Sequence, residues 1–421
     1  MWHVVLERTL GTSCCSHMNP SRRQSPYRSQ HLGRDHSPPR DIAWGLITFC
    51  ALLASPECVS SQQVTGRLVP ELRIQIPEDL GLSQIGAMAE GPHGELYLTD
   101  RGEARVIVVD TKGRLARMVG RRGEGPGEFR FVGSLGWMGD SLWVSDPAMR
   151  RLSFFGADGE YLRSLPFPVL RPRRPGLELS TEAILGDGSL LIRENWGVSD
   201  ASFVAATGLL VLRATRAGRI TDTVRWLAAR RGAMVVRLPT GGIMQRDQPW
   251  SDDDLHAIDP RGTEFIVVER PTAESPASAR FRLLVYGTDG RLRFERSVPY
   301  DPVALTGSRF DAEVQRAAAP ILRRFSSAGH AKDAVALEFF RPRFLPPVRN
   351  LLVGRDQSIW INVQRKESDE TWLVFDKTGT LTGTILAPPQ VRLLAVSSTG
   401  AWGIELDPND LPIPVRYRIE R

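Results

Sequence analysis

Four glycines within ten residues make the stretch 120–129, GRRGEGPGEF, a candidate for phosphate binding through backbone N–H groups. A P-loop ends in Gly-Lys followed by Ser or Thr, so that the lysine and the hydroxyl reach the phosphates and Mg²⁺. Here Glu128 and Phe129 end the stretch, and a strand pattern follows instead of the helix that a dinucleotide site opens. We therefore predict a connecting loop, in which glycine permits positive φ angles without a Cβ clash.

The sequence contains few side chains that could support metal binding or acid–base chemistry. After residue 61 the histidines are His93, His256 and His330, which lie far apart in the sequence. The run 252–254, Asp-Asp-Asp, could offer carboxylates to Ca²⁺. Successive side chains of a strand point to opposite faces, so the three acids cannot all converge, and we interpret the run as a solvated turn. A calcium site is kept as the alternative.

Nucleophilic catalysis has no motif in this sequence. There is no G-x-S-x-G elbow of the kind that presents a nucleophilic serine. All four cysteines lie in the first 58 residues, which excludes a thiol nucleophile from the rest of the chain. The sequence thus predicts no catalytic residue, no cofactor-binding residue and no metal ligand.

The elements that must position any site follow a repeat. Residues 94–113, 140–159 and 357–379 each read as an alternating strand, a polar loop, a second alternating strand and an x-x-Gly turn. Weaker copies occupy 179–226 and 252–298. Alternation with a period of two and regularly spaced glycine turns are typical of short antiparallel strands. The repeat therefore predicts an all-β chain built from four-stranded sheets.

The ends of the repeat predict how the sheets close into a ring. The tail 391–421 supplies three strands and lacks a fourth, whereas residues 68–76 form a strand pattern with no sheet of their own. Pairing the two completes six four-stranded antiparallel sheets of about 40 residues each, which is a six-bladed β-propeller. Such a ring leaves only short, protected strand edges.

Over residues 82–165 the chain resembles the NHL-type six-bladed propellers. The resemblance rests on the glycines and Phe129 of the stretch 120–129, and on an aspartate followed five residues later by an arginine. It implies that this arginine ties the strand ends, as Asp100 with Arg105 and Asp146 with Arg151. The match is partial over 345–389, where Asn362 and Trp372 replace the pair, and weak in the expected third and fourth blades.

Loop lengths predict which face of the propeller carries function. Loops between the second and third strands of a blade share a face with the connections between blades. The long segments all fall on this face, which we call the long-loop face: 194–208, 270–280, 363–371 and the insert 301–346 between blades four and five. Turns on the opposite face are tight, as at 111–113. Long loops in compact domains tend to carry function, so we place the site on the long-loop face.

The insert carries a helical pattern of apolar residues at spacings of three and four. The pattern comprises Phe310, Val314, Ala317, Ile321 and Phe325. Thr306 or Ser308 could cap this helix, and Pro320 should kink or break it. We predict a helix packed over the rim of the propeller, with a partner-binding groove as the alternative.

Five residues on or near that face are the candidate ligand-binding residues: Arg101, Trp196, Trp250, Asp252 and His256. The two tryptophans could stack on a sugar or a peptide, or instead fill the space between neighbouring blades. His256 is expected on an innermost strand, where it could face the central channel or be a hydrogen-bonded core histidine.

The first 61 residues read as a leader. Residues 42–54 form a 13-residue apolar run, which as a helix would span about 20 Å and is too short for a bilayer core of about 30 Å. Small residues after it indicate a signal peptide cleaved near Ser61. We expect a secreted or periplasmic protein with a propeller over 62–421 and no membrane span in the mature chain; an N-terminal membrane anchor is the alternative.

The charge balance argues against a nucleic-acid partner. The chain has 54 basic and 48 acidic residues, and 50 of the basic ones are arginines interleaved with acids. Removal of the leader lowers the net charge from +6 to +4. Taken together, the sequence predicts an exported binding or scaffold module for a protein, peptide or carbohydrate ligand. The alternative is a metal-dependent hydrolase or lyase, of the propeller lactonase or amidating-lyase kind, with its site at the channel mouth.

Overall fold

The computed structural model describes residues 65–74, 77, 80–82, 84–170, 177–196, 208–230, 233–237, 243–327, 336–337, 339–366 and 370–421. The chain divides into two compact units, Met1–Glu57 and Cys58–Arg421, and the described residues all lie in the second. The predicted leader with its apolar run 42–54 is outside them and stays a prediction. No helix within the described ranges is both long and apolar enough to span a bilayer.

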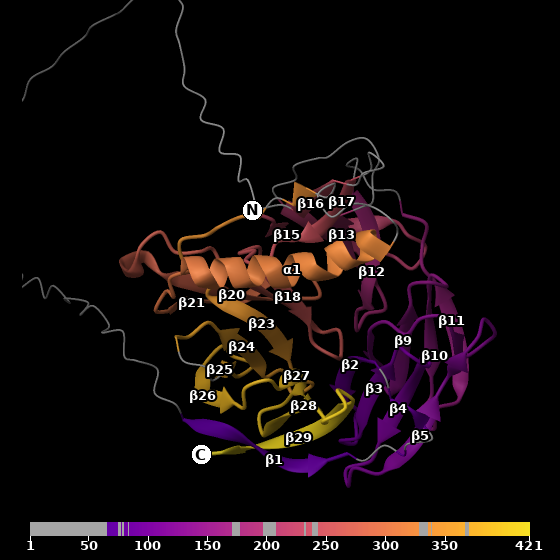
Figure 1. Ribbon diagram of the computed structural model, residues 1–421. Helices are drawn as coiled ribbons and strands as arrows, with labels where there is room; N and C mark the ends of the chain where they lie inside the picture. Colours follow the sequence, from indigo (N-terminus) through magenta and orange to yellow (C-terminus); the bar gives the residue numbers. More distant parts are fainter. Residues whose placement is uncertain are drawn as a thin grey trace, which may run out of the picture. The chain divides into compact units, whose positions relative to one another are not determined.

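Six four-stranded antiparallel blades surround a common axis (Figure 1), which confirms the predicted six-bladed β-propeller. Blades one to three are β2 (Ile85–Glu90), β3 (Leu96–Asp100), β4 (Arg105–Val109) and β5 (Leu115–Val119); β8 (Leu135–Met138), β9 (Ser141–Asp146), β10 (Arg151–Phe155) and β11 (Tyr161–Pro166); and β12 (Leu177–Ile184), β13 (Leu190–Trp196), β14 (Gly208–Ala214) and β15 (Ile220–Ala228). Blades four and five are β18 (Leu255–Ile258), β19 (Glu264–Glu269), β20 (Arg280–Gly287) and β21 (Leu292–Pro299); and β23 (Val348–Val353), β24 (Ile359–Val363), β25 (Glu370–Phe375) and β26 (Leu381–Ala387).

The sixth blade joins the two ends of the propeller. It contains β27 (Arg392–Val396), β28 (Gly400–Leu406) and β29 (Pro412–Glu420), and its outer strand is β1 (Gly66–Arg73). β1 pairs antiparallel with β29, from Arg67 opposite Glu420 to Arg73 opposite Val415, and the two lie side by side in Figure 1. The strand predicted at 68–76 therefore closes the ring as expected.

Position in the blade decides how deeply each strand is buried. The second strands β3 and β24 are buried along their whole length, because neighbouring blades cover both of their faces. The outer strands β5 and β21 are mostly exposed, including apolar side chains such as Met118 and Leu292. The apolar layers between blades form the core of the molecule.

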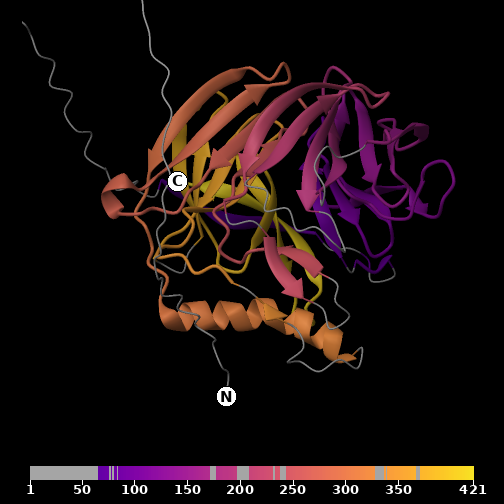
Figure 2. The same cartoon turned by 90° about the horizontal axis from the view of Figure 1, so that it is seen from above.

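Two elaborations rise from the long-loop face. The connection from blade three to blade four contains the hairpin β16 (Ala233–Arg237) and β17 (Ile243–Asp247), which the sequence did not predict and which pairs with β22 (Ala336–Leu337). The second elaboration is α1 (Gly307–Ser327), between β21 and β23, which continues through Pro320 and is therefore not broken by it. Figure 2 shows α1 lying outside the blades, on one face of the propeller. The hydroxyl of Thr306 accepts the Arg309 N–H at 3.4 Å, so Thr306 caps the helix.

The glycine stretch 120–129 is a structural connection between blades one and two. It contains the short parallel pair β6 (Arg121–Arg122) and β7 (Glu128–Phe129). The Gly125 N–H donates to the Glu128 carboxylate at 2.8 Å, so the loop's own acid occupies a backbone donor of the glycine stretch. Arg151 Nη2 donates to the carbonyls of Gly125 and Glu128 at 2.8 and 2.7 Å. The loop therefore bonds to itself and to blade two.

The implied aspartate–arginine tie is present in one blade and rearranged in the next. In blade one, Arg105 Nε lies 3.0 Å from the fully buried carboxylate of Asp100. In blade two, Asp146 instead accepts the backbone N–H groups of Arg130 and Met149. Arg151 bonds to the carbonyls of the glycine stretch instead of to Asp146.

Gly120→Ala should destabilise the protein by about 2 kcal/mol, because φ at this glycine is +72° and a Cβ would lie 2.2 Å from the Phe129 ring. The matched control is Gly139→Ala, where φ is +61° and no atom lies within 4 Å of the added Cβ. This control should cost about 1 kcal/mol, from backbone strain alone. Chemical denaturation of both variants measures the difference, and equal losses would show that the Phe129 contact does not matter.

Candidate functional site

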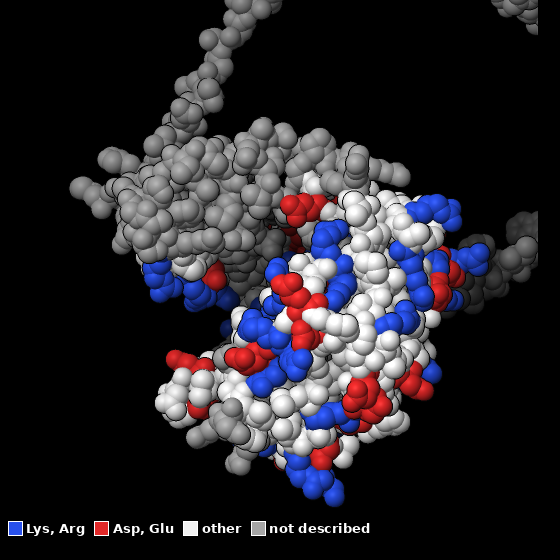
Figure 3. All heavy atoms as spheres, turned by 90° about the vertical axis from the view of Figure 1, so that its right-hand side faces the viewer, with Lys and Arg blue, Asp and Glu red and all other residues white. Residues whose placement is uncertain are grey.

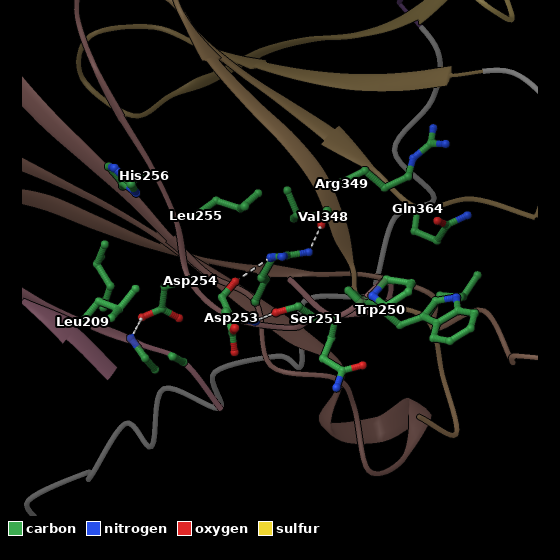
Figure 4. Close-up of a pocket in the computed structure, with 18 of the residues that line it drawn as sticks. Leu209, Trp250, Ser251, Asp253, Asp254, Leu255, His256, Val348, Arg349 and Gln364 are labelled. Carbon is green, nitrogen blue, oxygen red and sulfur yellow. Dashed lines mark hydrogen bonds between the residues drawn. The ribbon is translucent and has the colours of Figure 1, made fainter. Parts of the chain in front are cut away.

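A cavity of about 900 Å³ lies on the long-loop face, bounded by blades three, four and five and by α1. Its walls come from the ends of β13 to β15, the connection into β18, the loop after β19, the first half of α1 and the start of β23. In Figure 4, His256 and Leu209 lie at one side of the cavity, and Trp250 and Gln364 at the other. The volume is in the range of pockets that bind small organic ligands.

Trp250 packs against α1. Its ring stacks on Phe310 with centroids 4.8 Å apart, and only 5% of the residue is exposed. Val303, Leu305 and Leu345 complete this apolar cluster. Trp250 lines the cavity, but one face of its ring is occupied by Phe310. Its packing partner is thus the helix, whereas the sequence suggested a ligand or a neighbouring blade.

The acidic run 252–254 is not the solvated turn that the sequence suggested, because Asp252 and the Asp254 carboxylate are buried and accept hydrogen bonds from different protein donors. Asp252 is buried and accepts the N–H and the hydroxyl of Thr272 at 2.8 and 2.9 Å. Asp254 accepts the Ala228 N–H at 2.9 Å and Arg230 Nη1 at 2.8 Å. Burial raises the pKa of Asp254, although these two partners act to lower it. In the part of the chain that the structure describes, no three His, Cys, Asp or Glu side chains gather in a group that could hold a metal ion.

Arg270, the first residue after β19, joins blade four to blade five. Its Nε donates to the Asp253 carbonyl at 2.7 Å and its Nη1 to the Val348 carbonyl at 2.8 Å. Burial lowers the pKa of Arg270 to about 10, against the attraction of the nearby acids 252–254. The guanidinium therefore lines the cavity in a fixed orientation. The sequence marked the loop 270–280 as long but did not single out its first residue.

His256 faces an acid on the neighbouring inner strand. Its Nε2 lies 3.6 Å from Oε2 of Glu182, whose Oε1 accepts Arg193 Nε at 2.9 Å. Burial acts to raise the pKa of Glu182, but His256 and Arg193 outweigh it and lower this pKa to about 2. His256 and Arg193 line the cavity. Sequence reasoning found His256 and missed Glu182, which stands at an alternating position of β12 without any motif.

Of the remaining two candidates, Arg101 lies away from the cavity, and the side chain of Trp196 is outside the described residues. Arg101, in blade one, is exposed, does not line the cavity, and holds its guanidinium 5.3 Å from the centre of the Phe131 ring. Trp196 ends β13, and its side chain is not among the described residues. The structure thus brings two of the five candidates, Trp250 and His256, to the cavity, with Asp252 buried beside it.

Loops of three blades meet near the axis on the opposite face. The Trp137 N–H of blade two donates to the Pro260 carbonyl of blade four at 2.9 Å. Arg355 of blade five lies over the Trp137 ring, 5.1 Å from its centre. These contacts join blades two, four and five on the face opposite the cavity.

Charged residues on the side of the molecule in Figure 3 are interleaved in sign, with arginines and acids next to one another. Elsewhere in the described residues, arginines also pair with acids, as Arg130 with Glu124 and Arg213 with Asp187. A surface of this kind lacks the one-sided field that attracts polyanions.

A family described as a 6-bladed β-propeller, DUF5128, matches residues 74–174. Over blades one and two, the chain is similar to that family. These are also the blades in which the sequence resembles NHL-type propellers. A search of curated proteins finds no match.

Several solved structures are similar to this chain at low identity. A member of the DUF4221 family from Bacteroides vulgatus is 12% identical, with 85% of this chain and 99% of that chain covered and a TM-score of 0.45. Virginiamycin B lyase from Staphylococcus aureus is 9% identical, covering 84% and 99%, with a TM-score of 0.39. The calcium-binding protein regucalcin from Agrobacterium tumefaciens is 11% identical, covering 84% and 95%, with a TM-score of 0.33. Similarity at this level does not extend to ligands or activities.

Proposed function

We propose that this protein is an exported binding module whose ligand, a peptide or a carbohydrate, occupies the cavity on the long-loop face. The observation that carries the proposal is the cavity itself, since every long segment that the sequence placed on this face and that the structure describes contributes to it or lies beside it. Its wall mixes guanidinium, carboxylate, amide and imidazole groups. A peptide or a sugar could satisfy both donors and acceptors of this kind.

A metal-dependent hydrolase or lyase is the alternative, and His256 with Glu182 on adjacent inner strands is the observation that favours it. Two such side chains are fewer than the three or four protein ligands of a catalytic metal site. Stoichiometric calcium or zinc in elemental analysis of the purified protein would support this alternative over the binding module.

Narrowing the cavity from the helix side tests the proposal. Glu313 lines the cavity, whereas Gln315 is exposed on the same helix and does not. In a ligand-observed NMR screen of short peptides and oligosaccharides, we expect Glu313→Trp to weaken the binders at least about tenfold. Gln315→Trp, the matched control, should bind like the unchanged protein. Binders unaffected by Glu313→Trp, or a screen without binders, would contradict a ligand site in this cavity.

A further inference from the structure

We infer that the cavity binds its ligand through a carboxylate group and that Arg270 is the residue that receives it. This inference rests on the proposed function, because it assigns the chemistry of a ligand in the same cavity. It names a residue, a ligand group and an orientation that the proposed function leaves open.

Arg270 is held in a fixed orientation by neutral acceptors. Two of its three nitrogens donate to backbone carbonyls, those of Asp253 in blade four and Val348 in blade five. The third nitrogen, Nη2, makes no hydrogen bond with a described residue, and the side chain lines the cavity. A guanidinium fixed in this way has lost its rotamer freedom before a ligand arrives, so less entropy is lost when a carboxylate binds.

Most of the other charged side chains that line the cavity already form ion pairs. Arg193 bonds to Glu182, and Arg316 bonds to Glu313 on the same helix. Asp254 bonds to Arg230 at 2.8 Å. Each of these groups would have to break an ion pair before it could bind a ligand of opposite charge. They therefore offer less to a charged ligand than a guanidinium that bonds only to carbonyls.

The positive charge of the cavity exceeds its negative charge. Its described lining contains five arginines, at 193, 270, 309, 316 and 349, and three acids, Asp253, Asp254 and Glu313. Arg309 is exposed in the first turn of α1, and no ion pair of its guanidinium is seen within the described residues. Arg270 and Arg309 thus line the same cavity from different elements.

Burial strengthens the expected interaction. Arg270 lies where desolvation penalises its charge more than the acids 252–254 relieve it. A ligand carboxylate would compensate that charge, and a charge-assisted hydrogen bond in such a setting is about twice as strong as a neutral one. An amide or a hydroxyl in the same position would not compensate it. The cavity should therefore prefer an acid over its neutral analogue.

Matched acid and neutral probes test this preference. The peptide pair is N-acetyl-glycyl-leucine and its C-terminal amide, and the sugar pair is galacturonate and galactose. Each probe is titrated at constant ionic strength into the unchanged protein, Arg270→Gln and Arg296→Gln. Arg296 is the control because its guanidinium also donates to carbonyls of blade five, those of Gly379 and Thr378, far from the cavity.

We expect the acid of at least one pair to bind about tenfold or more tightly than its neutral partner. The preference should persist in Arg296→Gln and disappear in Arg270→Gln. The pair with the larger preference then shows whether a peptide end or a uronic acid is the better source of the carboxylate. Acid and neutral probes that bind equally in the cavity would overturn the inference and leave the proposed function intact. Absence of binding by all four probes would count against both.

A measurement on the unchanged protein covers the case in which Arg270→Gln fails to fold. Phenylglyoxal modifies arginine side chains, and mass spectrometry of peptides reports the modification rate at each position. The acid probe that binds should slow modification of Arg270 and leave Arg296 unaffected. Equal protection of the two arginines, or none at Arg270, would overturn the assignment.

Discussion

A chain that begins at Leu80 should fail to unfold cooperatively, whereas a chain that begins at Thr65 should keep a single sharp transition. The shorter chain lacks β1, which pairs with β29 from Val415 to Glu420 and also joins β26 in parallel through Gly66 and Arg67. Its loss leaves blade six with three strands and two strand edges unpaired. An exposed edge of this kind also invites association with other chains.

The size of the effect follows from what β1 and the residue after it, Ile74, bury. Leu68 is only 3% exposed and packs among the aromatic residues between blades five and six. Ile74 is only 2% exposed and packs against blade six and blade one. Burial of the two side chains contributes about 4 kcal/mol, and each hydrogen bond of the ladder adds about 1 kcal/mol. The sum is comparable with the whole stability of a typical domain, about 5–15 kcal/mol. Circular dichroism during thermal unfolding and limited proteolysis measure the loss.

A point substitution separates burial from the loss of the strand itself. Leu68→Asp keeps the backbone of β1 and places a charge in the core, so it should lower the midpoint of unfolding strongly. Val69→Asp is the control, because Val69 alternates with Leu68 and its side chain is half-buried. If the chain from Leu80 retained a sharp transition at the temperature of the longer chain, closure of the ring by β1 would be contradicted.

The fold could be predicted from the sequence because the patterns that specify it lie within short stretches of the chain. Alternation with a period of two, glycine turns and the repeat itself all act within one blade, so each copy supports the others. The closing strand followed from counting, since the tail lacked one strand and residues 68–76 had no partner. The hairpin β16–β17 was missed because it interrupts the repeat and pairs with β22, about 100 residues away along the chain.

The candidate site could be predicted only in outline. Loop lengths indicated the correct face for the cavity, because topology fixes which loops share a face. The groups that line it depend on contacts between blades, such as Arg270 with Val348 and His256 with Glu182, and spacing along the chain carries no signal of these. Trp250 was singled out as an aromatic residue next to a strand, but its partner Phe310 belongs to an insert with no fixed register against the blades.

Glu182→Gln should destabilise the protein at neutral pH by up to about 3 kcal/mol, and the loss should shrink as the pH falls. The pKa of Glu182 is lowered from 4.5 to about 2 in the folded chain, because His256 and Arg193 outweigh burial. Between these two values the unfolded chain binds a proton that the folded chain does not. The ionised Glu182 carboxylate therefore makes its full contribution to the free energy of unfolding above about pH 4.5. This contribution is lost as the pH approaches about 2.

The glutamine variant lacks this ionisation, so its stability should change less with pH across that window. Denaturant titrations between neutral pH and about pH 3 compare it with the unchanged protein and with Glu178→Gln, an exposed position on the same strand. The control should follow the unchanged protein throughout. If Glu182→Gln lowered the free energy of unfolding by the same amount over the whole pH range, the side chain would act through packing. In that case its charge would not be what holds Arg193 and His256 at the wall of the cavity.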